Sequence, residues 1–125
     1  MKNTELRIGN VFKEKYSGDL LVVSELTENR ITFDYQTNEK WQSEPIELTE
    51  EILLKCGFEN TFHSTNKDCF YHKELDFIIF LKSFIRNINY PYIDVLRGES
   101  IRIDFLHQLQ NLVFVLKGEE LEINL

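Results

Sequence analysis

The stretch DFLHQLQNLVFVLKG, residues 104–118, decides how the C-terminal part of this chain folds. Asp104 is a good N-cap and Gly118 a good terminator, so we expect a helix over residues 105–117. At 100° per residue, one arc of about 120° holds a stripe of apolar side chains, Phe105, Leu106, Leu109, Leu112, Val113 and Leu116. This stripe predicts that the helix packs on a core.

The opposite face of this helix carries His107, Gln110, Asn111 and Phe114. The solvent-exposed face of a helix normally carries Lys and Glu. Neutral amides, an imidazole and an aromatic ring are instead typical of a covered surface with directional hydrogen bonds. Three interpretations are open: the face packs under the N-terminal subdomain, forms a homodimer seam, or lines a ligand site through His107 and Asn111. These four residues are the candidate interface.

Upstream of the helix, residues 58–102 alternate between strand-like patches and turn signals, which predicts an antiparallel sheet of three to four strands. The expected strand regions are Phe70–Tyr71, Leu75–Leu81, Phe84–Ile88 and Tyr92–Leu96. The predicted helix over residues 105–117 would cover this sheet.

A short helix is expected over residues 50–56. Thr49 can cap it, and Glu50 and Glu51 place negative charge in its first turn, where the helix dipole favours it. Gly57 suits the left-handed position after the helix, and Phe58 can pack back on the helix end. A helix of only two turns needs tertiary contacts to persist in water. We expect it to link two subdomains.

Residues 1–48 show the period of two that is typical of strands, with turn residues about every ten positions. Four strands are expected, over Val11–Tyr16, Leu20–Val23, Ile31–Tyr35 and Trp41–Ile46. We therefore predict an α+β protein. Residues 1–48 should form a β-meander or small SH3-like barrel, and residues 49–125 an α+β subdomain.

The charge balance excludes several classes of partner. The net charge of −7 lies entirely within residues 19–51, which hold nine acids and two bases. Duplex nucleic acid needs clustered Lys or Arg, so we expect no such partner. No apolar run exceeds five residues, as in Phe77–Leu81, which is far shorter than the roughly 20 residues of a membrane span. Without an export leader either, the chain is expected to be cytoplasmic and not bound to a membrane.

The residues that carry catalytic or metal chemistry form no known signature. Cys56, His63, Cys69 and His72 have a spacing that matches no common zinc site, and a Cys69–His72 pair lacks an orienting third group. The five glycines are isolated, which excludes a phosphate loop or dinucleotide fingerprint. We therefore predict no metal, no cofactor and no enzymatic activity.

A second kind of site is open in the C-terminal half. Arginine and aromatic side chains together can hold a phosphate and a base, and five such residues lie near one another in sequence: Arg86, Tyr90, Tyr92, Arg97 and Arg102. They are the candidate residues for a small anionic ligand, for instance a nucleotide signal.

Three segments resemble a family of uncharacterised proteins carried by prophages and conjugative elements of Bacteroidetes. They are LRIGN (residues 6–10), PIELTEEILLKCGF (45–58) and HQLQNLVFVLKGEEL (107–121). The sequence departs from the family pattern at Cys56, Val113 and Val115. The absence of alanine and the abundance of isoleucine and asparagine fit an AT-rich genome, as such an origin implies. The resemblance implies no known activity.

Together these observations predict a non-enzymatic accessory protein of a phage or mobile element that acts by protein–protein binding. Its expected partners are a second copy of itself, a host protein or a phage protein. The alternative is a protein that sequesters a nucleotide signal in counter-defence.

Overall fold

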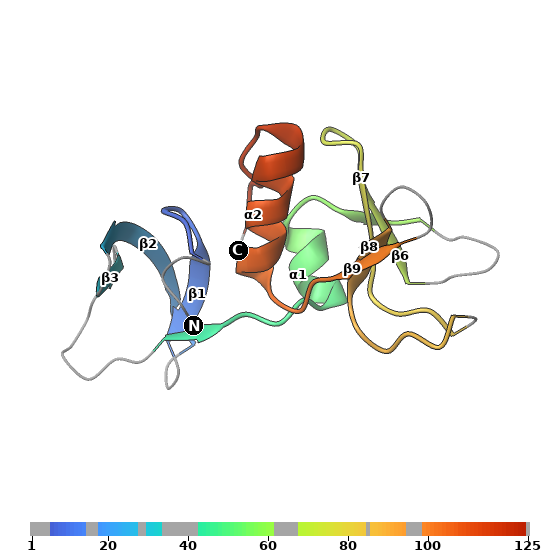
Figure 1. Cartoon of the computed structure of the whole chain (residues 1–125), viewed down its shortest axis with the longest axis horizontal. Coiled ribbons are helices and arrows are strands. Elements are labelled where there is room, and N and C mark those ends of the chain that lie inside the picture. Colours follow the sequence, from blue (N-terminus) through green and yellow to red (C-terminus); the bar gives the residue numbers. More distant parts are fainter. Residues whose placement is uncertain are drawn as a thin grey trace. The chain divides into compact units, whose positions relative to one another are not determined.

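A computed structural model of the chain describes residues 6–14, 18–27, 30–33, 43–61, 68–84, 86–94 and 99–124. It contains two antiparallel sheets, one short helix and one longer helix, which confirms the predicted α+β class (Figure 1). The chain forms two compact units. Unit 1 comprises residues 1–46 and 105–112, and unit 2 comprises residues 47–104 and 113–125.

Unit 1 contains the four predicted strands, β1 (Val11–Glu14), β2 (Leu20–Thr27), β3 (Arg30–Phe33) and β4 (Ser43–Pro45). Their order in the sheet is β3-β2-β1-β4, so the fourth strand returns to pair with the first. The predicted strand ends at Tyr16, Tyr35 and Trp41 lie outside the described residues.

Phe12 lies at the centre of the unit 1 sheet, opposite Leu21 on β2 and Pro45 on β4. It is fully buried and forms a core cluster with Leu6, Leu21 and Val23. Burial alternates along the described part of β2, where Leu21 and Val23 are buried while Leu20 is exposed and Val22 is half-buried, as expected of a strand with one face on the core.

Unit 2 begins with the short helix α1 (Glu50–Lys55). The side chain of Thr49 accepts a hydrogen bond from the Ile52 N–H, as the capping prediction requires. At the other end, Gly57 has φ +89°, and the N–H groups of Gly57 and Phe58 donate to the carbonyls of Leu54 and Leu53. This pattern is a Schellman motif, and it confirms the predicted helix end.

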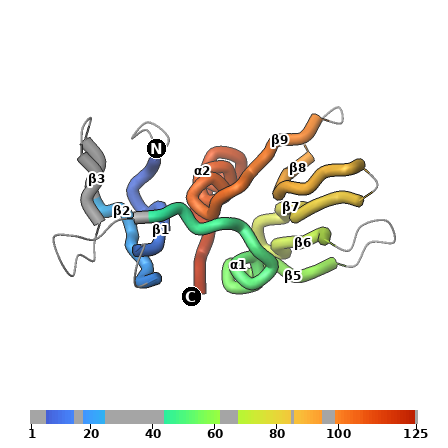
Figure 2. Tube along the Cα trace, turned by 90° about the horizontal axis from the view of Figure 1, so that it is seen from below, coloured from blue at the N-terminus to red at the C-terminus, as the bar shows by residue number. Residues whose placement is uncertain are grey.

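The unit 2 sheet is a five-stranded antiparallel meander in the order β5-β6-β7-β8-β9 (Figure 2). Its strands are β5 (Glu59–Asn60), β6 (Cys69–His72), β7 (Phe77–Phe80), β8 (Tyr92–Asp94) and β9 (Ser100–Arg102). The prediction of three to four strands missed the short edge strands β5 and β9.

The predicted strand Phe84–Ile88 is wrong, because its described residues belong to the turn between β7 and β8. Ser83 and Ile88 form an isolated bridge that closes the turn. Asn87 has φ +53°, a left-handed conformation that does not occur in a strand. Asparagine tolerates this conformation better than most residues, which makes it a common turn residue.

The long helix α2 (Leu106–Lys117) starts one residue later than predicted and ends at Gly118, which has φ +69°. The side-chain oxygen of Gln108 accepts a hydrogen bond from the Phe105 N–H just before the helix. The predicted division at residue 48 assigned the whole helix to the second subdomain. In the structure, residues 105–112 belong to unit 1, where the Leu106 N–H donates to the Ile46 carbonyl.

Candidate functional site

The polar face of α2 is covered within unit 1. Gln110 is 2% exposed, and its side-chain amide bridges two backbone groups at the start of β1. Its Oε1 accepts from the Val11 N–H at 2.9 Å, and its Nε2 donates to the Gly9 carbonyl at 3.0 Å. Both polar ends of this buried amide are therefore satisfied by the chain itself.

Asn111 extends this network. Its Oδ1 accepts from Nδ2 of the buried Asn10 at 2.7 Å and from Nε of Arg7 at 3.2 Å. Asn10 in turn accepts from the Arg7 backbone N–H at 2.7 Å. The helix is thus joined by directional bonds to the segment that leads into β1.

The His107 ring completes the same face. It is 2% exposed and stacks on two phenyl rings, with centroids 4.9 Å from Phe12 and 5.9 Å from Phe105. His107, Gln110 and Asn111 therefore make internal contacts of unit 1, which is the first of the three interpretations given above. The Gln110 amide and the Asn111 Oδ1 are hydrogen-bonded within unit 1, and the His107 ring stacks on phenyl rings of the same unit. Phe114, at 41% exposure, is the one member of the candidate interface that remains on the surface.

The candidate ligand residues form two arginine–tyrosine pairs. The Arg86 guanidinium lies 5.2 Å from the Tyr92 ring centroid and donates to Asp94 and to Ser100 Oγ, both at 2.7 Å. The hydrogen bond to Asp94 raises the pKa of Arg86, and the attraction of the carboxylate adds to this. Tyr92 is buried, so its ring faces cannot stack on a ligand.

The second pair joins Arg102, on β9, to Tyr90. The Arg102 guanidinium lies 4.5 Å from the Tyr90 ring centroid, and its Nε donates to both oxygens of Asp104, at 2.8 and 3.0 Å. Arg97 lies outside the described residues. Each of the two described arginines already has a carboxylate partner, which an anionic ligand would have to displace.

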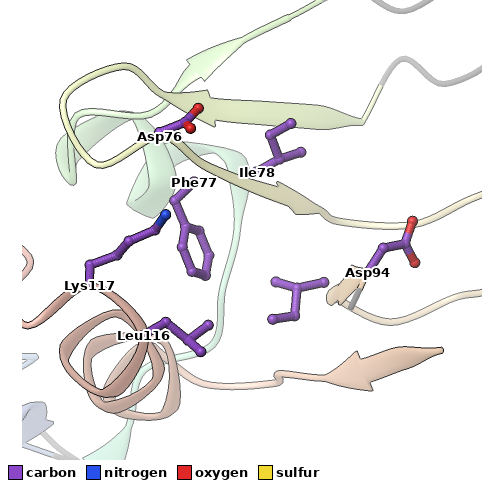
Figure 3. A pocket seen from close by; sticks show the side chains of 7 residues that line it. Asp76, Phe77, Ile78, Asp94, Leu116 and Lys117 are labelled. Atoms are coloured by element: carbon purple, nitrogen blue, oxygen red, sulfur yellow. The ribbon is translucent and has the colours of Figure 1, made fainter. Parts of the chain in front are cut away.

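A groove in unit 2 is the other candidate site (Figure 3). It has a volume of about 820 Å³, and its lining comes from the region of β7, from β8 and from the end of α2. The apolar part of the lining comprises Phe77, Ile78, Ile93 and Leu116, and the charged part comprises Asp76, Asp94 and Lys117. We call it the α2–β7 groove.

The groove exposes large apolar side chains. Leu116 is 54% exposed and Ile78 is 48% exposed, whereas Phe77 and Ile93 are buried. Figure 3 shows Phe77 and Leu116 pointing into the same space from two different elements. The prediction that Leu116 belongs to the buried stripe of the helix is therefore wrong.

Sequence reasoning missed this groove, although one signal was present. Phe114, Val115 and Leu116 are three consecutive apolar residues, and successive residues of a helix point 100° apart. No single face can bury all three, and all three are exposed, Val115 at 76%.

The two cysteines and His72 of unit 2 are buried in its interior. Cys56 and Cys69 are free and buried, and burial raises the pKa of the Cys56 thiol to about 12. The His72 Nδ1 accepts from the Leu75 N–H at 3.1 Å. His63 lies outside the described residues. Among the residues that are described, no three or more His, Cys, Asp or Glu side chains gather in a way that could hold a metal ion.

Comparison with protein-family models finds no match to this chain, and comparisons with curated proteins and with solved structures find no similar protein either. Within the described ranges, neither helix has the length and apolar character that crossing a bilayer requires.

Proposed function

We propose that this chain is a non-enzymatic binding protein whose partner is a protein held in the α2–β7 groove. The observation that carries the proposal is the 54% exposure of Leu116, on α2, at a groove whose apolar lining also includes Phe77 and Ile93 of the sheet. Exposed apolar side chains gathered in one place are typical of interaction sites.

The physical argument is one of burial. Removing apolar surface from water is favourable by roughly 25 cal/mol per Å², and a groove lets a partner side chain contact several walls at once. Phe77 and Ile93 are buried, so this part of the groove lining is packed and rigid. Asp76, Asp94 and Lys117 supply the polar edge that surrounds the apolar centre of most interfaces.

The biological setting of the proposal comes from the resemblance alone. The segments at residues 6–10, 45–58 and 107–121 support an accessory role for a phage or mobile element in the cytoplasm. The proposed partners are then a second copy of the chain, a host protein or a phage protein.

The alternative, sequestration of a small anionic ligand, has weaker support. Tyr90 and Arg102 form a stacked pair, which is a feature of nucleotide sites. However, Asp94 and Asp104 already neutralise the two described guanidinium groups. Protein binding through the groove therefore explains the exposed apolar side chains, whereas anion binding does not.

A photo-crosslinking amino acid tests the proposal when it replaces Leu116 in the full chain. On irradiation of bacteria that carry the gene, we expect discrete adducts between this position and one protein. The matched control places the same amino acid at Lys73, an exposed position of unit 2 outside the groove lining. Position 116 giving no more adduct than position 73 would overturn the proposal.

A further inference from the structure

His72, the last residue of β6, is a buried titratable group that belongs to neither candidate site. Its Nδ1 accepts a hydrogen bond from the Leu75 N–H at 3.1 Å, and this bond lies within the turn that joins β6 to β7. An imidazole nitrogen can accept a hydrogen bond only while it carries no proton. The turn is therefore closed by the neutral form of His72.

The His72 ring is packed tightly in unit 2. It makes a T-shaped contact with the Phe58 ring, with centroids 5.2 Å apart. A Cβ added at Gly57 would lie only 3.0 Å from His72 Nε2, so the backbone after α1 runs close to this nitrogen. The backbone of His72 is paired with Phe77 on β7. A ring enclosed in this way cannot easily turn away when its charge changes.

A proton on His72 would be a buried charge without a partner. The titratable side chains of the neighbouring elements are Cys56 after α1, Glu59 on β5, Lys73, Glu74 and Asp76 in the turn, and Lys117 at the end of α2. Within the described ranges, none of them forms a hydrogen bond or an ion pair with His72. Burial of an unpaired charge is costly, so the folded turn disfavours the protonated ring.

The turn that His72 closes leads directly into the α2–β7 groove. Asp76 ends the turn and Phe77 begins β7, and both line the groove (Figure 3). Asp76 has φ +50°, a left-handed conformation that is uncommon for a residue with a side chain. Such a conformation persists only where its surroundings hold it. Here the Leu75 bond to His72 precedes it, and the Tyr71 hydroxyl donates to its carboxylate at 3.0 Å.

We propose that protonation of His72 opens the turn between β6 and β7, so that the α2–β7 groove is complete only at neutral or higher pH. A proton on Nδ1 would point at the Leu75 N–H, which leaves two donors facing each other in place of a donor and an acceptor. The bond is therefore present above the pH at which an unperturbed histidine titrates, about 6.5, and is lost as the pH falls below it. This inference rests on the proposed function and adds its regulation.

Amide hydrogen exchange of the isotope-labelled full chain, followed by NMR between about pH 7.5 and about pH 5.5, measures the turn directly. Corrected for the intrinsic exchange rate, the protection of the Leu75 amide should fall roughly tenfold or more over this range. The matched variant is His72→Asn, since an asparagine Oδ1 can accept the same hydrogen bond and does not titrate. Its Leu75 amide should stay protected. The Ile103 amide, which donates to the Pro91 carbonyl at 2.9 Å elsewhere in unit 2, is the internal control and should not change.

The same samples report on the groove through the Leu116 methyl and Phe77 ring signals, which should shift with the Leu75 amide in the wild type and stay fixed in His72→Asn. A Leu75 amide that remains protected in acid, equal loss of protection in the variant, or groove signals that do not move would overturn the inference. If His72→Asn does not fold, the wild type decides: loss at Leu75 with Ile103 unchanged supports the inference, and equal loss at both overturns it. The measurement needs no partner, so its failure leaves the proposed function to the Leu116 crosslinking experiment.

Discussion

The side-chain oxygen of Gln110 accepts a hydrogen bond from the backbone N–H of Val11 at 2.9 Å, although the two residues lie 99 positions apart. The same amide donates to the Gly9 carbonyl, so one side chain of α2 takes the place of a neighbouring strand at this point of unit 1. This relationship explains why the polar face of the helix carries amides and no charges: the Gln110 amide and the Asn111 Oδ1 have fixed partners, and a charge there would have to be desolvated.

Replacing Gln110 with methionine, which is close to it in size, should destabilise the protein by about 3 kcal/mol. The variant leaves the Val11 N–H and the Gly9 carbonyl without their side-chain partner, and each unsatisfied buried group costs about 1–3 kcal/mol. Urea denaturation measures the change. The control is Val115→Met on the exposed side of the same helix, which should lose less than about 1 kcal/mol. Equal losses at the two positions would show that the Gln110 contacts are not significant.

The Schellman motif after α1 gives a second prediction. Gly57 has φ +89°, and a Cβ at this position would lie 3.0 Å from His72 Nε2, which is too close. Gly57→Ala should therefore cost about 2–3 kcal/mol, from left-handed strain and from displacement of the His72 ring. Gly118→Ala is the matched control, since it has φ +69° but open space around the added Cβ, and it should cost only about 1 kcal/mol. Thermal unfolding of both variants compares them, and a smaller loss at Gly57 would contradict this explanation.

The elements that could be predicted from the sequence are those fixed by neighbours in the chain. The ends of α1 depend on Thr49, Gly57 and Phe58, all within three residues of the helix, and each behaves as its local chemistry requires. The end of α2 at Gly118 follows the same rule. Local hydrogen bonds and glycine conformation leave little for tertiary structure to change.

The features that were missed depend on distant residues. The pairing of Gln110 with Val11 cannot be inferred from either segment alone, so the sequence left three interpretations of the helix face open. The apolar spacing around Phe84 resembles a strand, but the left-handed Asn87 and the Ser83–Ile88 bridge make it a turn. The groove is formed by β7, β8 and α2 together, and only the run Phe114–Leu116 hinted at it.

The arginine–tyrosine pairs give a third prediction, which separates the two candidate functions. We expect no cyclic nucleotide to raise the melting temperature, because Asp94 and Asp104 hold the guanidinium groups of Arg86 and Arg102. A ligand at one hundred times its dissociation constant would add about 2.7 kcal/mol, which is several degrees for a domain of this size. A thermal-shift panel measures this. A clear shift that Arg102→Gln abolishes would favour the ligand-binding alternative.

The buried thiol of Cys56 gives the fourth prediction, on alkaline stability. Its pKa is raised from 9.0 to about 12 in the folded chain, because burial disfavours the thiolate. Between these values the unfolded chain loses the proton and the folded chain keeps it, so the free energy of unfolding should fall as the pH rises from 9. At pH 11 this loss is roughly 2–3 kcal/mol. Tyrosines and lysines titrate in the same range, and Cys56→Ala isolates the thiol because both chains share those groups. The variant should be less stable than the wild type at pH 8, where the buried sulfur still packs. That difference should shrink steadily toward pH 11 in urea denaturation, whereas a constant difference would mean that Cys56 ionises as readily in the folded chain as in the unfolded one.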